Sequence, residues 1–314
     1  MKKLTVGLFN DSFPPNIDGV ANTVVNYARI IQEKYGRSVV VAPKYKNVVD
    51  DYPFKVIRYQ SFPTDKTRIR YRTGNPFSIN ALRKVAKENL DLIHCHSPFT
   101  AAMLVRNANS HHRLPVVMTY HTKFDDDIAF TVKNKSFRKI GGKIVVSSFN
   151  YADEVWTVSN GCAKSLRALG YQGDYRVMVN GADITLDPAS DEIMRQVQAQ
   201  TGFNSSELVF MYCGRMQWYK GIKIILDALV KVKAAGVRFR MIFVGGGYEL
   251  EDIKAYTRKV GLTTQTLFTG PIHDRALLKG YFTRADLFLF PSTYDTAGLV
   301  VMEAAACRTP RGLI

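Results

Sequence analysis

The sequence predicts an α/β protein made of two Rossmann-like, doubly wound parallel-sheet domains. Apolar runs of strand length alternate with amphipathic stretches of helix length along most of the chain, a pattern that indicates parallel strands joined by helical crossovers. The alternation is interrupted once, by the turn-rich stretch "VNGADITLDPAS" at 179–190. Because 314 residues are enough for two ordinary domains, we expect one domain at 1–180 and another at 181–314.

The first domain opens with "LTVGLFN", a continuous apolar run typical of a buried strand. The next stretch, 20–36, carries apolar residues at spacings of three and four and stops at Gly36, which predicts a helix. Ser78 and Ser159 are candidate N-caps of later helices. The predicted elements, in order, are a strand at 4–10, a helix at 20–36, strands at 38–43 and 53–59, a helix at 77–89, strands at 90–96 and 115–121, a helix at 139–152, a strand at 154–159 and a helix at 160–169.

The second domain repeats the alternation. Its predicted elements are a strand at 208–213, a helix at 220–235, a strand at 239–244, a helix at 248–260, a strand at 266–269, a helix at 273–283, a strand at 286–290 and a helix from 298. No element is predicted after this last helix.

Charge is distributed unevenly between the two halves. Residues 1–180 hold 27 Lys and Arg against 14 Asp and Glu, whereas residues 181–314 hold 16 against 13. A basic first half favours a polyanionic neighbour, either nucleic acid or an anionic membrane surface, and a solvated basic surface is the alternative. The segment "RIRYRTG" at 68–74 suits nucleic acid or lipid headgroups equally well.

The same composition bears on the cellular compartment. The four cysteines show no CxxC spacing and fit a reducing environment. The apolar stretch at the start is too short for a signal sequence, and no run has the length of a membrane span. We therefore expect a cytoplasmic protein that lies on a membrane, if it meets one, without crossing it.

Loops after the strands of the first domain are the places to look for chemistry, because ligands bind beyond the carboxyl ends of parallel strands. Asp18 and Gly19 directly precede a predicted helix, where a glycine lets backbone N–H groups approach a phosphate or a sugar. An ordinary helix-entry turn is the alternative. His121 ends a strand and could donate a hydrogen bond to a sugar hydroxyl or a developing negative charge, although such a histidine is more often structural. His94 and His96 flank a cysteine, without a further ligand at metal-site spacing.

In the second domain, "MYCGRMQWYKG" at 211–221 follows a strand. Gly214 permits a tight exit, and Arg215 and Lys220 are placed to converge, so a diphosphate would neutralise both cations. Two solvated charges are the alternative. Gly246 lies in "VGGGYE", which lacks the GxGxxG spacing of a dinucleotide site and suits a nucleotide base or ribose.

The final helix should begin near Ala297 or Gly298, where its first N–H groups can hold a phosphate. Glu303 lies in the apolar run "LVVMEAAA", where a charge needs a specific partner such as the vicinal hydroxyls of a ribose. Asp295 lies in the preceding loop, at the other end of such a nucleotide sugar.

These segments resemble the retaining, nucleotide-sugar-dependent glycosyltransferases of family 4, also called glycosyltransferase group 1, which have the GT-B fold with two domains facing a cleft. The matching stretches include "PPNIDGVANTV", "TYHTKFD", "CGRMQWYKGI" and "PSTYDTAGLVVMEAAACRTP", in the family's order along the whole chain. The most specific motif is the pair of acids separated by seven residues, here Asp295 and Glu303.

The resemblance implies a role for each matching position. Arg215 and Lys220 match the pair that binds the donor diphosphate and stabilises the leaving group, Glu303 matches the ribose-binding glutamate, and Asp295 matches the acid near the donor sugar. It implies no metal, because the two cations supply the electrostatic stabilisation. The residues implied as catalytic are His121, Arg215, Lys220 and Asp295, and those implied for donor binding are Gly19, Gly214, Arg215, Lys220, Gly246, Asp295, Gly298, Leu299 and Glu303.

The resemblance also implies partners. The basic first half and "TYHTKFDDD" are similar to members that glycosylate diacylglycerol or other membrane lipids, in which the N-terminal domain takes the acceptor and the C-terminal domain the nucleotide sugar. We therefore expect a UDP-hexose donor, a lipid or saccharide acceptor, docking on the inner face of the plasma membrane, and no nucleic acid.

The end of the chain departs from the family pattern. Arg308 stands where the family usually has glycine, and the family continues beyond the tail "RGLI" with further strand–helix units. This predicts a truncated second domain that lacks its last strands. It leaves open the alternative of an inactive relative that only binds a membrane or a partner.

Overall fold

The computed structural model describes residues 3–16, 18–63, 72–111, 113–124, 135–182, 184–203, 206–293, 295–296 and 298–313. The chain divides into two compact units, Met1–Asn180 and Gly181–Ile314. In the described residues, no helix has the length and apolar character needed to cross a membrane. Part of the basic segment 68–74 and of the loop 119–127 lies outside the described residues.

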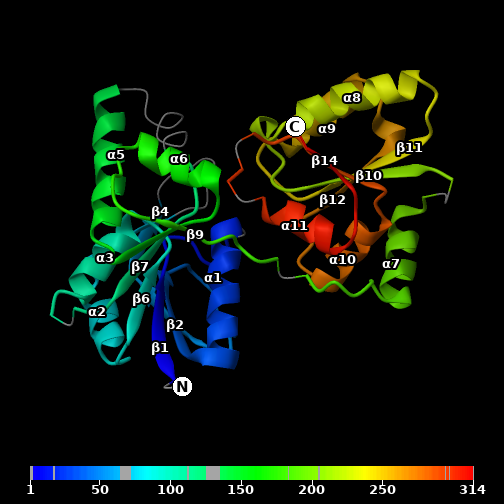
Figure 1. The fold of residues 1–314 in the computed structure, drawn as a ribbon. Helices are drawn as coiled ribbons and strands as arrows, with labels where there is room; N and C mark the ends of the chain where they lie inside the picture. Colours follow the sequence, from blue (N-terminus) through cyan, green and yellow to red (C-terminus); the bar gives the residue numbers. More distant parts are fainter. Residues whose placement is uncertain are drawn as a thin grey trace. The chain divides into compact units, whose positions relative to one another are not determined.

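The first unit is built on a seven-stranded parallel sheet with the order β3-β2-β1-β6-β7-β8-β9 (Figure 1). Its strands are β1 (Leu4–Phe9), β2 (Gly36–Pro43), β3 (Lys55–Tyr59), β6 (Leu92–Cys95), β7 (Val116–Tyr120), β8 (Glu154–Thr157) and β9 (Arg176–Val177). A separate antiparallel pair consists of β4 (Ser61–Pro63) and β5 (Arg72–Gly74). The central strands are buried along most of their length, as their continuous apolar runs predict.

Helices cover both faces of this sheet (Figure 1). They are α1 (Gly19–Ile30) with its π-helical extension η1 (Ile31–Tyr35), α2 (Ile79–Ala86), α3 (Thr100–Ala108), α5 (Lys135–Asn150) and α6 (Asn160–Ala168). Tyr27 of α1 packs on His94 of β6, whereas Tyr120 of β7 contacts Phe149 of α5 on the opposite face. A hydrogen bond between Tyr120 and Ser165 places α6 on the same face as α5.

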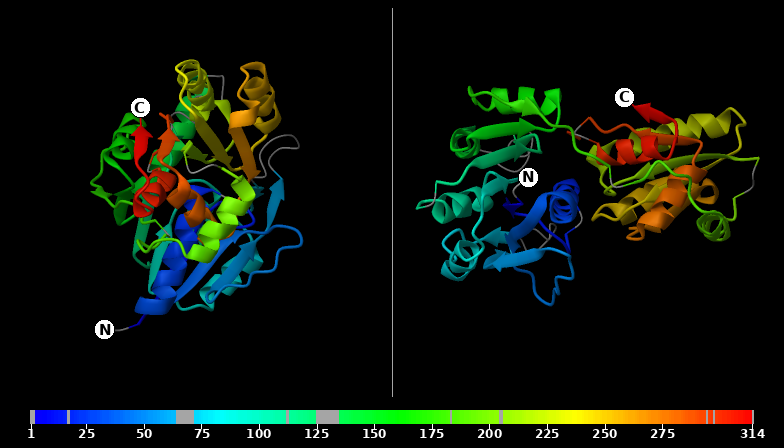
Figure 2. Two further views of the ribbon diagram at one scale, coloured as in Figure 1. Left: turned by 90° about the vertical axis from the view of Figure 1, so that its right-hand side faces the viewer. Right: turned by 60° about the horizontal axis from the view of Figure 1, so that its bottom comes forward.

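The second unit has a five-stranded parallel sheet with the order β12-β11-β10-β13-β14. Its strands are β10 (Leu208–Cys213), β11 (Phe239–Val244), β12 (Thr266–Gly270), β13 (Leu287–Phe290) and β14 (Arg311–Leu313). Its helices are α7 (Asp191–Thr201), α8 (Ile222–Ala234), α9 (Leu250–Lys259), α10 (Arg275–Arg284) and α11 (Leu299–Ala306), with short 3₁₀ turns η2 (Trp218–Lys220) and η3 (Thr263–Gln265). Helices α8 and α9 lie on one face, and α7, α10 and α11 on the other (Figures 1 and 2).

The tail of the chain forms an element where none is predicted. Residues Arg311–Leu313 are β14, which pairs in parallel with β13 and lies at the edge of the sheet. The turn before it is anchored by Thr309, whose hydroxyl donates to the Phe282 carbonyl at 2.6 Å. We predicted no helix or strand after the last helix, and β14 shows that this prediction is wrong.

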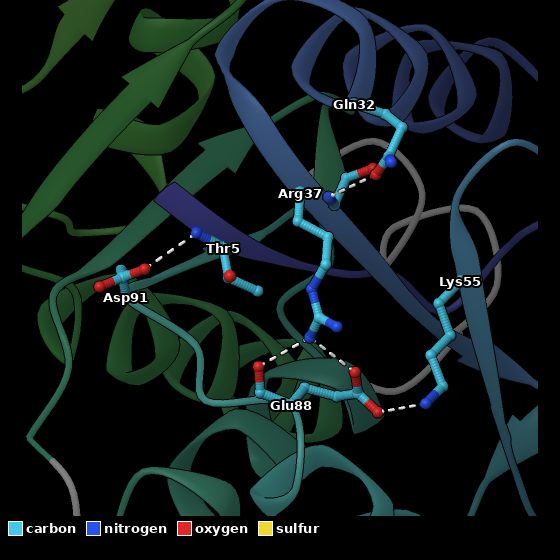
Figure 3. A network of polar contacts seen from close by, with 7 residues as sticks. Thr5, Gln32, Arg37, Lys55, Glu88 and Asp91 are labelled. Carbon is cyan, nitrogen blue, oxygen red and sulfur yellow. Dashed lines mark hydrogen bonds and ion pairs between the residues drawn. The ribbon is translucent and has the colours of Figure 1, made fainter. Parts of the chain in front are cut away.

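A polar network joins the amino ends of three strands to the end of α2 (Figure 3). The carboxylate of Glu88, 4% exposed, accepts a hydrogen bond from Arg37 at 2.8 Å and another from Lys55 at 2.5 Å. Arg37 also donates to the backbone carbonyl of Glu88, and Thr5 donates its N–H to Asp91. The network therefore ties β1, β2 and β3 to the segment that leads into β6.

We expect Glu88→Gln to lower the free energy of unfolding of the first unit by about 1–2 kcal/mol. Two charge-assisted hydrogen bonds to a buried carboxylate are weakened, but both cations are about half exposed and regain water. Urea unfolding measures the change. Glu33→Gln, at an exposed carboxylate, is the matched control, and equal stability of the two variants would contradict the prediction.

Candidate functional site

The strand order of the second unit creates a switch point between β10 and β13. The chain runs from β10 outward to β11 and β12, then returns to place β13 on the other side of β10. Ligands of doubly wound sheets bind at such a point, beyond the carboxyl ends of the two strands. Arg215 and Lys220 follow β10, and Asp295 and Glu303 follow β13, so all four predicted residues border this switch point.

Lys220 and Asp295 form an ion pair across the two loops. The Lys220 ammonium lies 2.8 Å from both carboxylate oxygens of Asp295. The side chains are 12% and 27% exposed, so the pair is shielded but open to solvent on one side. The pairing was not foreseen from the sequence, which gave the two residues separate roles around a donor.

The close approach of the two loops depends on Gly221, the residue after Lys220. Gly221 has a φ of +79°, and a Cβ there would lie 2.6 Å from the carbonyl oxygen of Pro291, just past β13. A larger residue would push the Lys220 turn away from the loop that carries Asp295. The glycine therefore sets the distance at which the ion pair forms.

Arg215 belongs to the same end of the sheet. The buried hydroxyl of Tyr212 donates to the Arg215 carbonyl at 3.1 Å. Burial raises the pKa of Tyr212, the carboxylate of Asp295 raises it further, and the guanidinium of Arg215 lowers it. Both charges therefore act on one phenol at this end of the sheet. The sequence analysis did not select Tyr212 as a site residue, because an aromatic residue inside an apolar strand is typical of the hydrophobic core.

The glycines after β10 and β11 hold the Arg215 loop by backbone contacts. The Met216 N–H donates to the carbonyl of Gly246 at 3.0 Å, and the Gly214 N–H donates to Val244 at 3.0 Å. A Cβ on Gly245 would lie 1.9 Å from the Gly214 carbonyl oxygen. In this structure, Gly214 and Gly246 thus support the loop that carries the cation.

Helix α11 contributes the remaining predicted residues of this unit. Gly298, with a φ of +48°, is the N-cap, and Leu299 is the first helical residue, close to the predicted start. Ala297 lies outside the described residues. Glu303, 8% exposed, accepts a 2.7 Å hydrogen bond from Arg275 at the start of α10. A charged partner of Glu303 is therefore present within the protein, and Arg275 is a residue that the sequence did not single out.

In the first unit, Gly19 begins α1 at the switch point between β1 and β6. Asp18 caps the helix by accepting from the Ala21 N–H at 2.8 Å, and it also bonds to the hydroxyl of Ser12. The helix-entry role of this dipeptide is therefore observed directly. Both Asp18 and Ser12 are buried, which fixes the loop in front of the helix.

His121 lies in a buried row of three histidines. Its Nε2 is 2.9 Å from Nδ1 of His96, and Nε2 of His94 is 2.7 Å from the Thr119 hydroxyl. Burial lowers the pKa of His94 and of His121 to about 3, and that of His96 falls well below its usual value. Neutral His121 has one ring N–H that donates and one ring nitrogen that accepts, and it carries no charge near pH 7. In the described residues, no group of three or more His, Cys, Asp or Glu is arranged to hold a metal ion.

We expect the first unit to lose stability on mild acidification. The folded pKa values lie below the unfolded value of 6.5, so below pH 6.5 the unfolded chain binds more protons and unfolding is favoured. Between pH 7 and pH 5 the free energy of unfolding should fall by up to about 2 kcal/mol per histidine. Urea unfolding followed by Trp156 fluorescence, in a Trp218→Phe background, measures this.

The control for this pH dependence is a histidine in the other unit. His94→Gln should give a shallower dependence than the parent, whereas His273→Gln, at an exposed site, should leave it unchanged. An identical pH dependence in the His94→Gln variant and its parent would contradict the assignment.

Comparisons with known proteins identify the family of this chain. The model of Glycosyltransferase Family 4 matches residues 17–186, and that of Glycosyl transferases group 1 matches residues 194–311. Alpha-monoglucosyldiacylglycerol synthase of Streptococcus pneumoniae is 26% identical, over 98% of this chain and 70% of that protein. The enzyme of the same name from Acholeplasma laidlawii is 24% identical, over 98% and 79%.

Solved structures share the fold. HepE of Anabaena, in complex with UDP and glucose, superposes with a TM-score of 0.76 at 19% identity, over 98% of this chain and 80% of that one. Sucrose-phosphate synthase of Thermosynechococcus elongatus gives 0.75 at 19% identity, over 99% and 81%. The prediction of a GT-B protein with two Rossmann-like domains is confirmed, and the comparisons give no support to an inactive binding module. The chain belongs to glycosyltransferase family 4.

Proposed function

We propose that this glycosyltransferase moves a hexose from a UDP-hexose to a diacylglycerol-type lipid, with retention of the anomeric configuration. The observation that carries the proposal is the placement of Arg215 and of the Lys220–Asp295 pair beyond β10 and β13. Support for the donor comes from HepE, whose structure holds UDP and glucose, and support for the acceptor comes from the two related synthases.

Each charged side chain has a role in the proposed reaction. Arg215 and Lys220 bind the diphosphate, and Lys220 exchanges part of its contact with Asp295 for a phosphate oxygen. The bond between C1 of the hexose and the β-phosphate oxygen breaks, and the acceptor oxygen bonds to C1 on the same face. The acceptor proton passes to the departing phosphate, and the two cations stabilise the negative charge that develops there without a metal.

The remaining predicted residues are assigned in the same way. Glu303 accepts hydrogen bonds from the ribose hydroxyls, Asp295 orients the donor hexose, and Gly298 and Leu299 offer backbone N–H groups to the phosphates. Gly214 and Gly246 keep the Arg215 loop in place. The first unit is assigned the acceptor, with Gly19 and His121 as its candidate residues.

A screen of ligands tests the donor assignment. UDP should raise the Tm of the protein more than GDP or ADP, because the proposed donor is a UDP-hexose, and UDP-glucose should be turned over in the presence of diacylglycerol. The product is detected with a radiolabelled sugar and chromatography of the lipid phase. Absence of a Tm shift with all three nucleoside diphosphates would overturn the proposal.

The membrane surface belongs to the same proposal. Met103 of α3 and Ile140 and Ile144 of α5 are about half exposed, with Lys139 and Lys143 beside them. The two helices lie on the same face of the sheet (Figure 1) and are joined by a 2.5 Å hydrogen bond from Arg106 to the Ser147 carbonyl. Exposed apolar side chains among lysines favour docking on an anionic bilayer.

Sedimentation with vesicles tests this surface. The protein should bind phosphatidylglycerol vesicles more tightly than phosphatidylcholine vesicles, and Ile140→Ser combined with Ile144→Ser should weaken that binding. Ile224→Ser, at a similarly exposed isoleucine of the second unit, is the control. Binding that does not depend on anionic lipid would contradict the assignment.

A further inference from the structure

The ion pair between Arg275 and Glu303 joins two helices on one face of the second sheet. Arg275 is the first residue of α10 and Glu303 lies in the second turn of α11. Nη2 of Arg275 donates to Oε1 of Glu303 at 2.7 Å. The two helices pack against each other, and both lie on the face opposite α8 and α9 (Figure 1).

The position of Arg275 is unfavourable for an arginine unless the glutamate holds it. A cation in the first turn of a helix is repelled by the positive end of the helix dipole. Asp274, the N-cap, offsets this by accepting from the N–H groups of Ala276 and Leu277. The guanidinium nevertheless extends toward the carboxylate of α11, which indicates that the pair itself fixes the arginine.

Glu303 is buried, and its charge acts on two cysteines. The pKa of Cys213 is raised to about 12, mainly by burial and also by the charge of Glu303, whereas Arg275 lowers it. Burial also raises the pKa of Cys307 and Lys279 lowers it, and Glu303 and Arg275 again shift it in opposite directions. A carboxylate in such surroundings requires a charged hydrogen-bond donor. In the described part of the chain, Arg275 is the side chain that bonds it.

We propose that Arg275 is a positioning residue for the donor: it occupies Oε1 of Glu303 and so leaves Oε2 to accept a hydrogen bond from a ribose hydroxyl. The inference rests on the proposed function of Glu303. Arg275 acts through the carboxylate and has no contact with the donor. The side chain of Arg275 is 40% exposed and that of Glu303 only 11%, which places the arginine on the solvent side of the pair. The single 2.7 Å contact from the planar guanidinium holds one carboxylate oxygen, which a flexible ammonium would hold less firmly.

Two ligands separate this role from simple neutralisation of a buried charge. UDP carries both ribose hydroxyls, and 2′,3′-dideoxyuridine diphosphate carries neither. Calorimetric titration of the whole protein should show about tenfold tighter binding of UDP than of the dideoxy compound. Arg275→Ala should lower UDP affinity about tenfold and leave dideoxy affinity unchanged, Arg275→Lys should recover part of the loss, and Arg258→Ala, at an exposed arginine of α9, should change neither.

A double-mutant cycle and the kinetics complete the test. Glu303→Gln should lose the same preference, and Arg275→Ala should cost nothing more in that background. In turnover, Arg275→Ala should raise KM for the donor and leave kcat nearly unchanged. If Arg275→Ala destabilises the fold, the comparison is made with Arg275→Lys. This variant should lose part of its preference for UDP over the dideoxy compound.

The results distinguish failure of the positioning role of Arg275 from failure of the proposed function. Equal weakening of UDP and dideoxy compound, additive losses in the cycle, or full preference in the Arg275 variants would overturn the positioning role alone. A wild-type protein that binds no nucleoside diphosphate would overturn the proposed function, and this inference with it.

Discussion

Replacement of Lys220 by alanine is expected to lower kcat/KM for the nucleotide-sugar donor by about 10²- to 10³-fold, the usual effect of removing one preorganised donor from a developing negative charge. The ammonium is 12% exposed and held within 2.8 Å of both Asp295 oxygens, so it is already oriented before the donor binds. Steady-state kinetics with varied donor measure the loss.

Stability should change little in this variant. Asp295 is 27% exposed and can be solvated when its partner is removed, so we expect a loss of about 1 kcal/mol or less in the free energy of unfolding. Lys223→Ala is the matched control, because Lys223 lies three residues further along and forms an exposed pair with Asp227. A Lys220→Ala enzyme as active as the Lys223→Ala enzyme would show that the ammonium does not act on the donor.

Replacement of Gly245 by alanine is expected to damage both the fold and donor binding. The residue has a φ of +132°, and a Cβ would lie 1.9 Å from the carbonyl oxygen of Gly214, which is backbone and cannot rotate away. The loops after β10 and β11 would have to separate, and Arg215 would move with its loop. We expect a loss of about 3 kcal/mol or more in unfolding free energy, from strain plus overpacking, and at least tenfold weaker UDP binding.

Gly236→Ala provides the control for backbone strain. Gly236 also has a positive φ, +76°, but a Cβ there would meet nothing within 4 Å. Thermal unfolding and UDP titration of both variants separate strain, which they share, from the clash, which only Gly245→Ala has. Equal effects of the two substitutions would contradict the packing argument.

The fold could be predicted from the sequence because the central strands are apolar runs and most of the predicted helices repeat apolar residues at helical spacing. Most elements agree with the prediction to within a few residues. Helices α3 and α7 were missed although both are amphipathic, and β14 was missed because a three-residue strand has no period to detect. The β4–β5 hairpin was missed for the same reason.

The candidate site was only partly predictable. Arg215, Lys220, Asp295 and Glu303 could be selected because each follows a strand at its carboxyl end. Their pairing could not be predicted, since the contact of Lys220 with Asp295 depends on β13 lying beside β10. The contact of Arg275 with Glu303 likewise depends on two helices sharing one face of the sheet.

We propose above all that the two phosphoryl groups of an activated sugar bind beyond the carboxyl ends of β10 and β13. Calorimetric titration of the same protein with UDP and with UMP tests it most directly. We predict that UDP binds at least tenfold more tightly than UMP, and that this advantage disappears when Arg215 and Lys220 are both replaced by alanine. Equal affinity for UDP and UMP, or an advantage that survives the double replacement, would contradict the account.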